Sequence, residues 1–423
     1  MSKLNEALTL RRAQNAFYSC LEKGLDGPPY DPLRIAEMLG IGVESSESVV
    51  EARTIRGPQG NFSIQYNPQR PRARMRFSIA HEIMHVLLAS EGANEWHRSG
   101  KVASRAEWEN EMLCNLGAAE FLLPQEDIAG ALTPGEFTIN SVNEMRKKFD
   151  VSVETILLKF VRNTRQAVFV FSASYSAKGG EALCLDYFVP SNSWKFDIRK
   201  GYEIPAGSKA YSCDTLGFTA KASEKLFVEG KKIHWEAIAI PAISGSKKPR
   251  IVGFASYNAN LSAQPDWEIS YVTGDATQAE ADKKILIAQV MNNKSMIWGA
   301  GFSRQLARKY PDAQTSYRDW VLKNGDQRKL GAIHSFQYSE NLQIVSMVAQ
   351  SGFGPSTVPR IRYEVLRECL SKLGDLALKE ASEIQIPRIG AGLAGGKWEI
   401  IERMLIEEIS AKGANVVVVD LPK

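Results

Sequence analysis

Two histidines and a glutamate lie within five consecutive residues, in the order H-E-x-x-H. They are His81, Glu82 and His85. On a helix, residues four apart lie one turn apart on the same face, so both imidazoles can offer a nitrogen to one Zn²⁺. Glu82 projects beside them and can take a proton from the water that attacks a peptide carbonyl. The pattern predicts a hydrolytic metal centre; the alternative is a chance match with hydrogen-bonded core histidines.

A catalytic zinc usually has a third protein ligand. The remaining histidines are poorly placed, in a polar segment or far along the chain: His97, His234 and His334. A second helix, predicted over residues 107–123, offers Glu111 instead. Two alternatives remain open on spacing alone: Glu111 is a solvated helix glutamate, or Cys114 is the ligand. We take Glu111 as the third ligand.

These side chains need elements that hold them in place. Residues 76–88 are apolar nearly all round, so their helix should be buried. Residues 53–56 and 61–66 alternate on either side of a Gly/Pro turn and predict a hairpin. Its strand pairs with an extended substrate or simply covers the helices. Arginines at alternate positions over 70–76 favour a solvated lead-in to the helix over a nucleic-acid patch.

The first 165 residues resemble the ImmA/IrrE family of metallopeptidases. The resemblance rests on residues 76–88, Glu111-x-x-x-Asn115, the ending Glu120-Phe-Leu-Leu-Pro124, and flanking matches at 35–43 and 149–156. It implies three metal ligands, His81, His85 and Glu111. It implies Glu82 as general base. Two positions depart from the usual pattern: Met84 replaces a glycine and Cys114 an alanine.

Length and composition place the chain among multidomain globular proteins. It has 423 residues, 44% hydrophobic and 24% charged, and a formal charge of +4. It contains no apolar run near 18 residues, and its first residues lack an apolar signal core, so no membrane association is expected. Five scattered cysteines fit reduced thiols. The protein is therefore expected to be cytoplasmic, and its mild charge predicts no direct nucleic-acid binding.

The second half of the chain divides into two regions. Residues 166–262 hold short strand-like runs between Gly, Ser and Lys turns, which predicts a β-rich domain without a catalytic constellation. In residues 263–423 strands alternate with helices, which predicts an α/β sheet that binds ligands at its strand ends. A glycine-rich turn at 390–396 precedes a helix, and such a turn can bind phosphate through backbone N–H groups.

Residues 263–423 resemble a macro domain, in the branch of terminal ADP-ribose glycohydrolases and ADP-ribose-1''-phosphate phosphatases. The resemblance rests on residues 386–398. It implies that Asp275 holds the adenine amine, that residues 299–302 line the distal ribose and that the glycine-rich turn binds pyrophosphate. The implied ligand-binding set is Asp275, Asn292, Gly299, Ala300, Gly301, Phe302, Gly390, Ala391, Gly392, Leu393, Ala394 and Gly395.

Several positions depart from the hydrolytic relatives. The loop after strand 342–348 reads Ala349-Gln350-Ser351, where those relatives use a lysine. Ala394 stands where they use an aspartate, and Lys397 where they often carry an acid. Binding without turnover is therefore expected, with Asn292 or Asn293 as a candidate to position a water in a weak hydrolase.

We therefore predict an α+β multidomain protein. A mainly helical zincin-like peptidase domain (1–165) precedes a β-rich middle domain (166–262) and an α/β macro domain with a mixed sheet (263–423). The predicted activity is zinc-dependent cleavage of a specific protein partner, recruited or regulated by ADP-ribose or an ADP-ribosylated macromolecule. The family suggests a stress or phage response. The alternative is an ADP-ribosyl hydrolase, or a non-catalytic ADP-ribose reader, whose peptidase-like half docks partners.

Overall fold

The computed structural model divides the chain into two compact units. The first comprises Met1–Ala13 and Gly27–Pro265, and the second Gln14–Asp26 and Asp266–Lys423. The structure describes residues 3–89, 105–129, 137–175, 182–199, 201–242, 248–257, 269–279, 283–323 and 328–421. No helix among these is long and apolar enough to cross a membrane. The predicted domain boundaries stay predictions, as do the cytoplasmic location and the lack of nucleic-acid binding.

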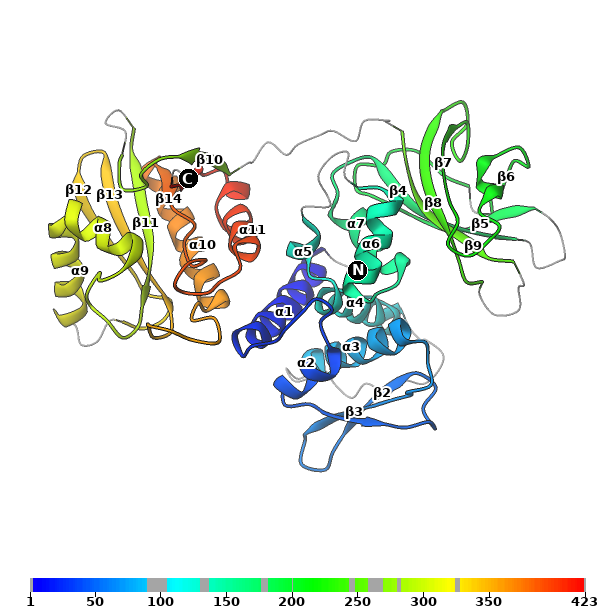
Figure 1. Ribbon diagram of the computed structural model, residues 1–423, viewed down its shortest axis with the longest axis horizontal. Coiled ribbons are helices and arrows are strands. Elements are labelled where there is room, and N and C mark those ends of the chain that lie inside the picture. The colour runs from blue at the N-terminus through cyan, green and yellow to red at the C-terminus, as the bar shows by residue number, and fades with distance from the viewer. Residues whose placement is uncertain are drawn as a thin grey trace. The chain divides into compact units, whose positions relative to one another are not determined.

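The first unit holds the helices of the predicted peptidase region (Figure 1). They are part of α1 (Lys3–Glu22), and α2 (Pro32–Met38), α3 (Arg72–Ala89), α4 (Arg105–Leu122), α5 (Gln125–Ala129), α6 (Ile139–Phe149) and α7 (Val153–Asn163). Local sequence explains where two of them begin. Asp31 accepts a hydrogen bond from Leu33 N at the start of α2, and Ser152 accepts one from Thr155 N at the start of α7.

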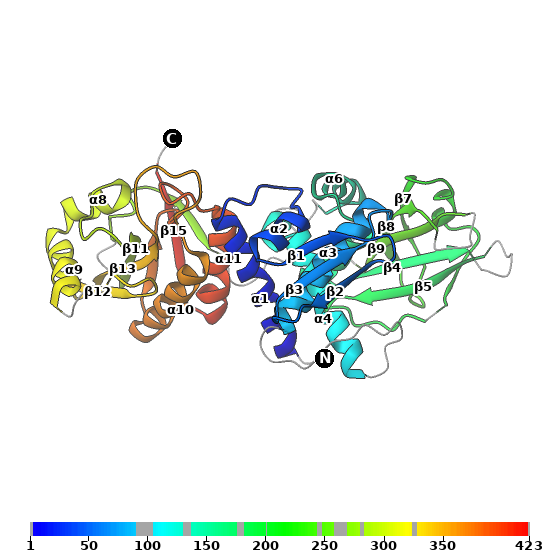
Figure 2. The same cartoon turned by 90° about the horizontal axis from the view of Figure 1, so that it is seen from below.

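A small sheet lies against α3 (Figure 2). Its order is β1 (Gly42–Ser45), β3 (Phe62–Tyr66) and β2 (Ala52–Arg56). The predicted hairpin is confirmed, because β2 and β3 pair antiparallel. The parallel strand β1 was missed. This arrangement places β2 at an edge of the sheet, next to the buried helix.

The arginines before α3 are engaged by nearby acids and carbonyls. Arg74 pairs with Glu51 at 2.8 Å, and Arg72 pairs with Asp150 at 2.5 Å. Arg76 is buried and donates to the carbonyl oxygen of Tyr30 at 2.8 Å. These contacts fix the first turns of α3, so Arg76 belongs to the core and not to the solvated lead-in that the sequence suggested.

A six-stranded antiparallel sheet completes the first unit. Its order is β6 (Glu203–Ile204), β5 (Leu183–Pro190), β4 (Val168–Tyr175), β9 (Arg250–Ser256), β8 (Ile233–Ile240) and β7 (Thr219–Glu224). Aromatic side chains, among them Phe169 and Trp235, fill its core. Helix α7 packs on β4 and β9, and Arg250 forms two hydrogen bonds with Glu154 of that helix.

The second unit contains a mixed sheet with helices on both faces (Figure 1). Its order is β10 (Ser270–Thr273), β15 (Val416–Asp420), β14 (Glu383–Ile386), β11 (Ile285–Asn292), β13 (Leu342–Gln350) and β12 (Ile333–Ser339). All neighbours are parallel except β12 and β13. Helices α8 (Gly301–Lys309) and α9 (Pro311–Lys323) lie on one face, α10 (Tyr363–Glu380) and α11 (Trp398–Glu408) on the other. The carboxyl ends of the five parallel strands therefore share one edge.

His334 of β12 gives this unit a testable pH dependence. Burial lowers its pKa from 6.5 to about 4. As the pH falls below about 6.5, the unfolded chain takes up a proton that the folded chain does not. Stability is therefore full above pH 6.5 and falls toward pH 4. Compared with His334→Gln, we expect the native protein to lose about 2 kcal/mol more between pH 7 and pH 5, measured by urea unfolding. Equal losses would contradict this.

Candidate metal and phosphate sites

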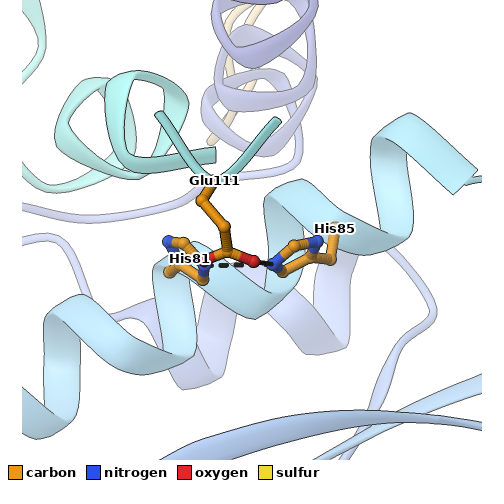
Figure 3. A group of neighbouring side chains, drawn as sticks. All are labelled: His81, His85 and Glu111. Carbon is orange, nitrogen blue, oxygen red and sulfur yellow. Dashed lines mark hydrogen bonds and ion pairs between the residues drawn. The ribbon is translucent and has the colours of Figure 1, made fainter. Parts of the chain in front are cut away.

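Three side chains that could hold a metal ion converge between α3 and α4. His81 and His85 lie one turn apart on α3, and Glu111 of α4 points between their rings (Figure 3). His81 Nε2 lies 3.3 Å from Glu111 Oε2, and His85 Nε2 lies 3.3 Å from Glu111 Oε1. The two Nε2 atoms are 3.0 Å apart. The structure thus brings the three predicted ligands together, with their ligand atoms within 4.8 Å of one another.

The neighbours of this cluster favour a cation. Asn115 Oδ1 lies 2.9 Å from His81 Nδ1. An amide oxygen only accepts hydrogen bonds, so Nδ1 carries the hydrogen and Nε2 keeps its lone pair. Lone pairs and a carboxylate converge here, and such a set fits a divalent ion such as Zn²⁺.

Cys114 lies on the other side of the His85 ring. Its Sγ is 3.5 Å from His85 Nδ1, and not beside Nε2. The thiol can thus orient the imidazole from outside the metal cluster. Of the two alternatives for a third ligand, this geometry favours Glu111. His97 lies outside the described residues.

Glu82 is buried beside the cluster and has a partner that the sequence did not reveal. Its side chain is 2% exposed. Thr54 of β2 donates to Glu82 Oε2 at 2.9 Å. Thr54 therefore orients the candidate general base from the neighbouring sheet.

The loops at the carboxyl ends of the parallel strands form a second candidate site. Gly390 and Gly395 have positive φ, and a Cβ on Gly396 would lie 2.8 Å from Gly390 O. The turn needs glycine at these positions. Within the described part of the chain, the N–H groups of Gly392, Leu393 and Ala394 have no acceptor. They are open to water or to an anion.

A helix N-terminus lies beside this turn. Helix α8 starts at Gly301, and its N-cap residue Ala300 makes no side-chain cap. A Cβ built on Gly301 would lie 3.8 Å from Leu393 Cδ1. The start of α8 therefore lies next to the glycine-rich turn, and backbone N–H groups at such places are suited to a phosphate-containing ligand.

Asp275 follows strand β10 and Asn292 is the last residue of β11, at the same edge of the sheet. Asp275 Oδ1 accepts from Thr277 N at 2.9 Å, and this bond holds the pKa of the carboxyl below its usual range. Asn292 Oδ1 accepts from Ser295 N at 2.7 Å. Both oxygens shape their own loops. Asn293 Oδ1 accepts from Gly352 N at 3.0 Å, so each amide oxygen of the predicted water-positioning pair already has a partner.

Comparison with known proteins identifies both regions. Residues 37–160 match the Peptidase_M78 model, the IrrE N-terminal-like domain. The radiation response metalloprotease IrrE of Deinococcus deserti is 28% identical over 188 residues, covering 42% of this chain and 66% of the relative. An ADP-ribose 1''-phosphate phosphatase of Lodderomyces elongisporus is 27% identical over 162 residues, covering 36% of this chain and 99% of the relative.

A macrodomain protein of Streptomyces coelicolor, known as a solved structure, is 33% identical. It covers 36% of this chain and 99% of its own, with a TM-score of 0.32. The chain carries an IrrE-like peptidase domain, and its C-terminal part is homologous to macrodomains. Both resemblances seen in the sequence are confirmed, and so is the α+β multidomain class. The chain spans slightly under two thirds of the IrrE relative. The roles of individual site residues stay predictions.

The IrrE-like domain accommodates Met84 through Gly117 on the facing helix. A Cβ on Gly117 would lie 2.5 Å from Met84 Sδ, and Met84 is fully buried. We expect Gly117→Ala to lower the free energy of unfolding, because overpacking costs about 1–3 kcal/mol and outweighs the higher helix propensity of alanine. Chemical denaturation measures this.

The matched control is the double variant with Met84→Ala. Removing the methionine side chain relieves the clash, so the double variant should lose at least about 1 kcal/mol less than the sum of the two single variants. Additive losses would show that Met84 and Gly117 do not constrain each other.

Proposed function

We propose that the protein is a zinc-dependent endopeptidase that cleaves a specific protein partner. The observation that carries this proposal is the convergence of His81, His85 and Glu111, with Glu82 on the same buried helix. The match of residues 37–160 to the IrrE-like domain supports it. Histidines that only fill a core would not be expected to direct their acceptor nitrogens, together with the Glu111 carboxylate, at one point.

The side chains divide the chemistry between them. When bound by His81, His85 and Glu111, Zn²⁺ supplies Lewis acidity toward the scissile carbonyl and the attacking water. Glu82 accepts the proton of that water and passes it to the leaving amine. Thr54 holds Glu82 Oε2, so the carboxylate is oriented before substrate arrives. Asn115 keeps the hydrogen of His81 on Nδ1.

The substrate enters as an extended strand in this proposal. β2 is an edge strand of the small sheet, and its Thr54 contacts Glu82. A peptide that pairs with the open edge of β2 passes close to the general base. In such pairing, main-chain hydrogen bonds supply the affinity and contacts to the substrate's side chains supply the specificity. A folded partner must therefore present a loop or tail.

The macrodomain-like region binds ADP-ribose or an ADP-ribosylated macromolecule. Its uncapped α8 and the glycine-rich turn offer adjacent N–H groups for the diphosphate, and its relatives include an ADP-ribose 1''-phosphate phosphatase. Ala394 offers no acid at the turn, which favours binding over turnover. This ligand recruits or regulates the peptidase, in a stress or phage response. The ligand regulates only if it binds resting and cleaving forms with different affinity.

The test compares wild type with Glu82→Gln in an extract of source cells. New protein N-termini are detected by mass spectrometry, with and without added ADP-ribose. We expect a cut site that only the wild type produces, at a rate that ADP-ribose changes. Identical N-termini from both proteins, with zinc bound to each, would contradict the peptidase.

A second candidate is an ADP-ribosyl hydrolase whose IrrE-like domain docks partners. The Lodderomyces relative of the C-terminal region is named as a phosphatase of ADP-ribose 1''-phosphate, and this supports a hydrolytic role for the region. Release of free ADP-ribose from a modified protein, lost in Asp275→Ala, would support it. Bound ADP-ribose that is recovered intact would instead support a protein that binds ADP-ribose without hydrolysing it.

A further inference from the structure

A short strap, residues 358–363, holds the glycine-rich turn from behind. Arg360 N and Ile361 N donate to Ala394 O at 2.8 and 3.2 Å. The hydroxyl of Tyr363 accepts from Lys397 N at 2.8 Å. The strap thus contacts both the middle and the end of the turn. Its position sets which way the open N–H groups point.

Residues 14–26, which comprise the end of α1 and the segment after it, contact this strap within the same unit. Glu22 Oε1 accepts from Tyr363 N at 2.8 Å. The rings of Tyr18 and Tyr363 lie 5.2 Å apart, and both are essentially fully buried. Helix α10 begins at Tyr363, and its N-cap residue Arg362 makes no side-chain cap. Glu22 therefore caps α10 from 341 residues away in the sequence.

Further contacts make this attachment more than one hydrogen bond. Glu22 Oε2 lies 3.6 Å from Arg362 Nη1, and both side chains are partly buried. Asn15 donates to Glu364 at 3.1 Å in the first turn of α10. Polar and aromatic contacts thus converge on the start of one helix. Residues 14–26 are therefore an integral part of the second unit.

We propose that residues 14–26 are a positioning element of the nucleotide site. They hold Tyr363, and Tyr363 holds the glycine-rich turn in the shape that binds a diphosphate. This rests on the proposed ADP-ribose binding. By linkage, ligand at the turn and attachment of residues 14–26 to the strap stabilise each other. The macrodomain-like fold thereby depends on residues at the opposite end of the chain.

The test uses the full chain and three variants with different predicted effects. Glu22→Ala removes the cap, and Tyr363→Phe removes the bond to Lys397 N while keeping the ring against Tyr18. Asp375→Ala, which removes an exposed acid further along α10, is the matched control. Hydrogen exchange of amides 392–397 is followed without ligand, and ADP-ribose affinity is measured by calorimetry.

We expect faster exchange of these amides in the first two variants and an affinity weakened by up to about fivefold in Glu22→Ala, because the coupling to the ligand is limited by what the lost helix cap contributes. Asp375→Ala should match wild type in both. Unchanged exchange in Glu22→Ala and Tyr363→Phe would overturn the positioning role. A wild type that binds no ADP-ribose would overturn the proposed ligand alone, because ligand-free exchange still decides what residues 14–26 do to the turn.

Discussion

Glu82→Gln is expected to slow peptide hydrolysis by about 10²–10⁴-fold, the usual contribution of a general base. Glutamine keeps the size of the side chain and can still accept from Thr54 at the 2.9 Å contact. It cannot take a proton from water. The metal ligands are untouched, so zinc content should stay the same. Single-turnover cleavage and elemental analysis measure the two quantities.

The matched control for this prediction is Glu107→Gln. Glu107 lies in the first turn of α4 and outside the set of converging metal-binding atoms. Its variant should cleave at the wild-type rate. Cleavage by Glu82→Gln within a few fold of wild type would remove Glu82 from the mechanism. Loss of zinc from that variant would instead show that the substitution disturbed the helix.

Asp275→Asn is expected to weaken ADP-ribose binding by about 10–100-fold, the range for a hydrogen bond to a charged group. Asp275 Oδ1 holds the N–H of Thr277, and asparagine preserves that acceptor. The second carboxylate oxygen becomes an NH₂ group and can no longer accept from the adenine amine. The turn stays folded while the base contact is lost. Calorimetric titration of both proteins measures the difference.

An analogue with hypoxanthine in place of adenine tests the same contact from the ligand side. It lacks the exocyclic amine, so wild type should bind it more weakly than ADP-ribose. Asp275→Asn should lose this preference, because its NH₂ group cannot accept from the adenine amine but can donate to the carbonyl oxygen of hypoxanthine. A variant that still prefers ADP-ribose by the wild-type ratio would place the adenine away from Asp275.

Short-range patterns predicted that His81 and His85 share one helix face, because their spacing requires only that residues 76–88 be helical. Spacing on the second helix left Glu111 open against two alternatives, and the structure brings Glu111 to the two histidines. The partners of these residues come from elsewhere in the fold. Thr54 lies on a strand 28 residues before Glu82 in the sequence. The packing of that strand against α3 creates the contact, and no sequence pattern predicts it.

The same limit applies to the second unit. Its glycine turn was readable, because positive φ demands glycine. The contact between Glu22 and Tyr363 joins residues 341 apart, and no local pattern announces it. Helix α9 was missed although its buried residues Ala313, Tyr317 and Val321 recur every four positions. Polar residues between them hid that period.

The strand β12 was missed for a related reason. It is an edge strand in which only His334 is buried and most residues face solvent. Its hydrophobic period is therefore faint. Arg76 shows the reverse case, where a charged residue in a basic run is buried because it binds main-chain carbonyls. Composition alone assigns such a residue to the surface.

Zinc titration of cleavage tests the central claim most directly. Protein stripped by a chelator receives zinc in small steps, and the new N-terminus found in the extract is quantified at each step. A site made by His81, His85 and Glu111 predicts that cleavage rises linearly and stops rising at one zinc per chain, and that His85→Ala stays inactive there. Full cleavage by the stripped protein, or none at any zinc level, would contradict a metallopeptidase.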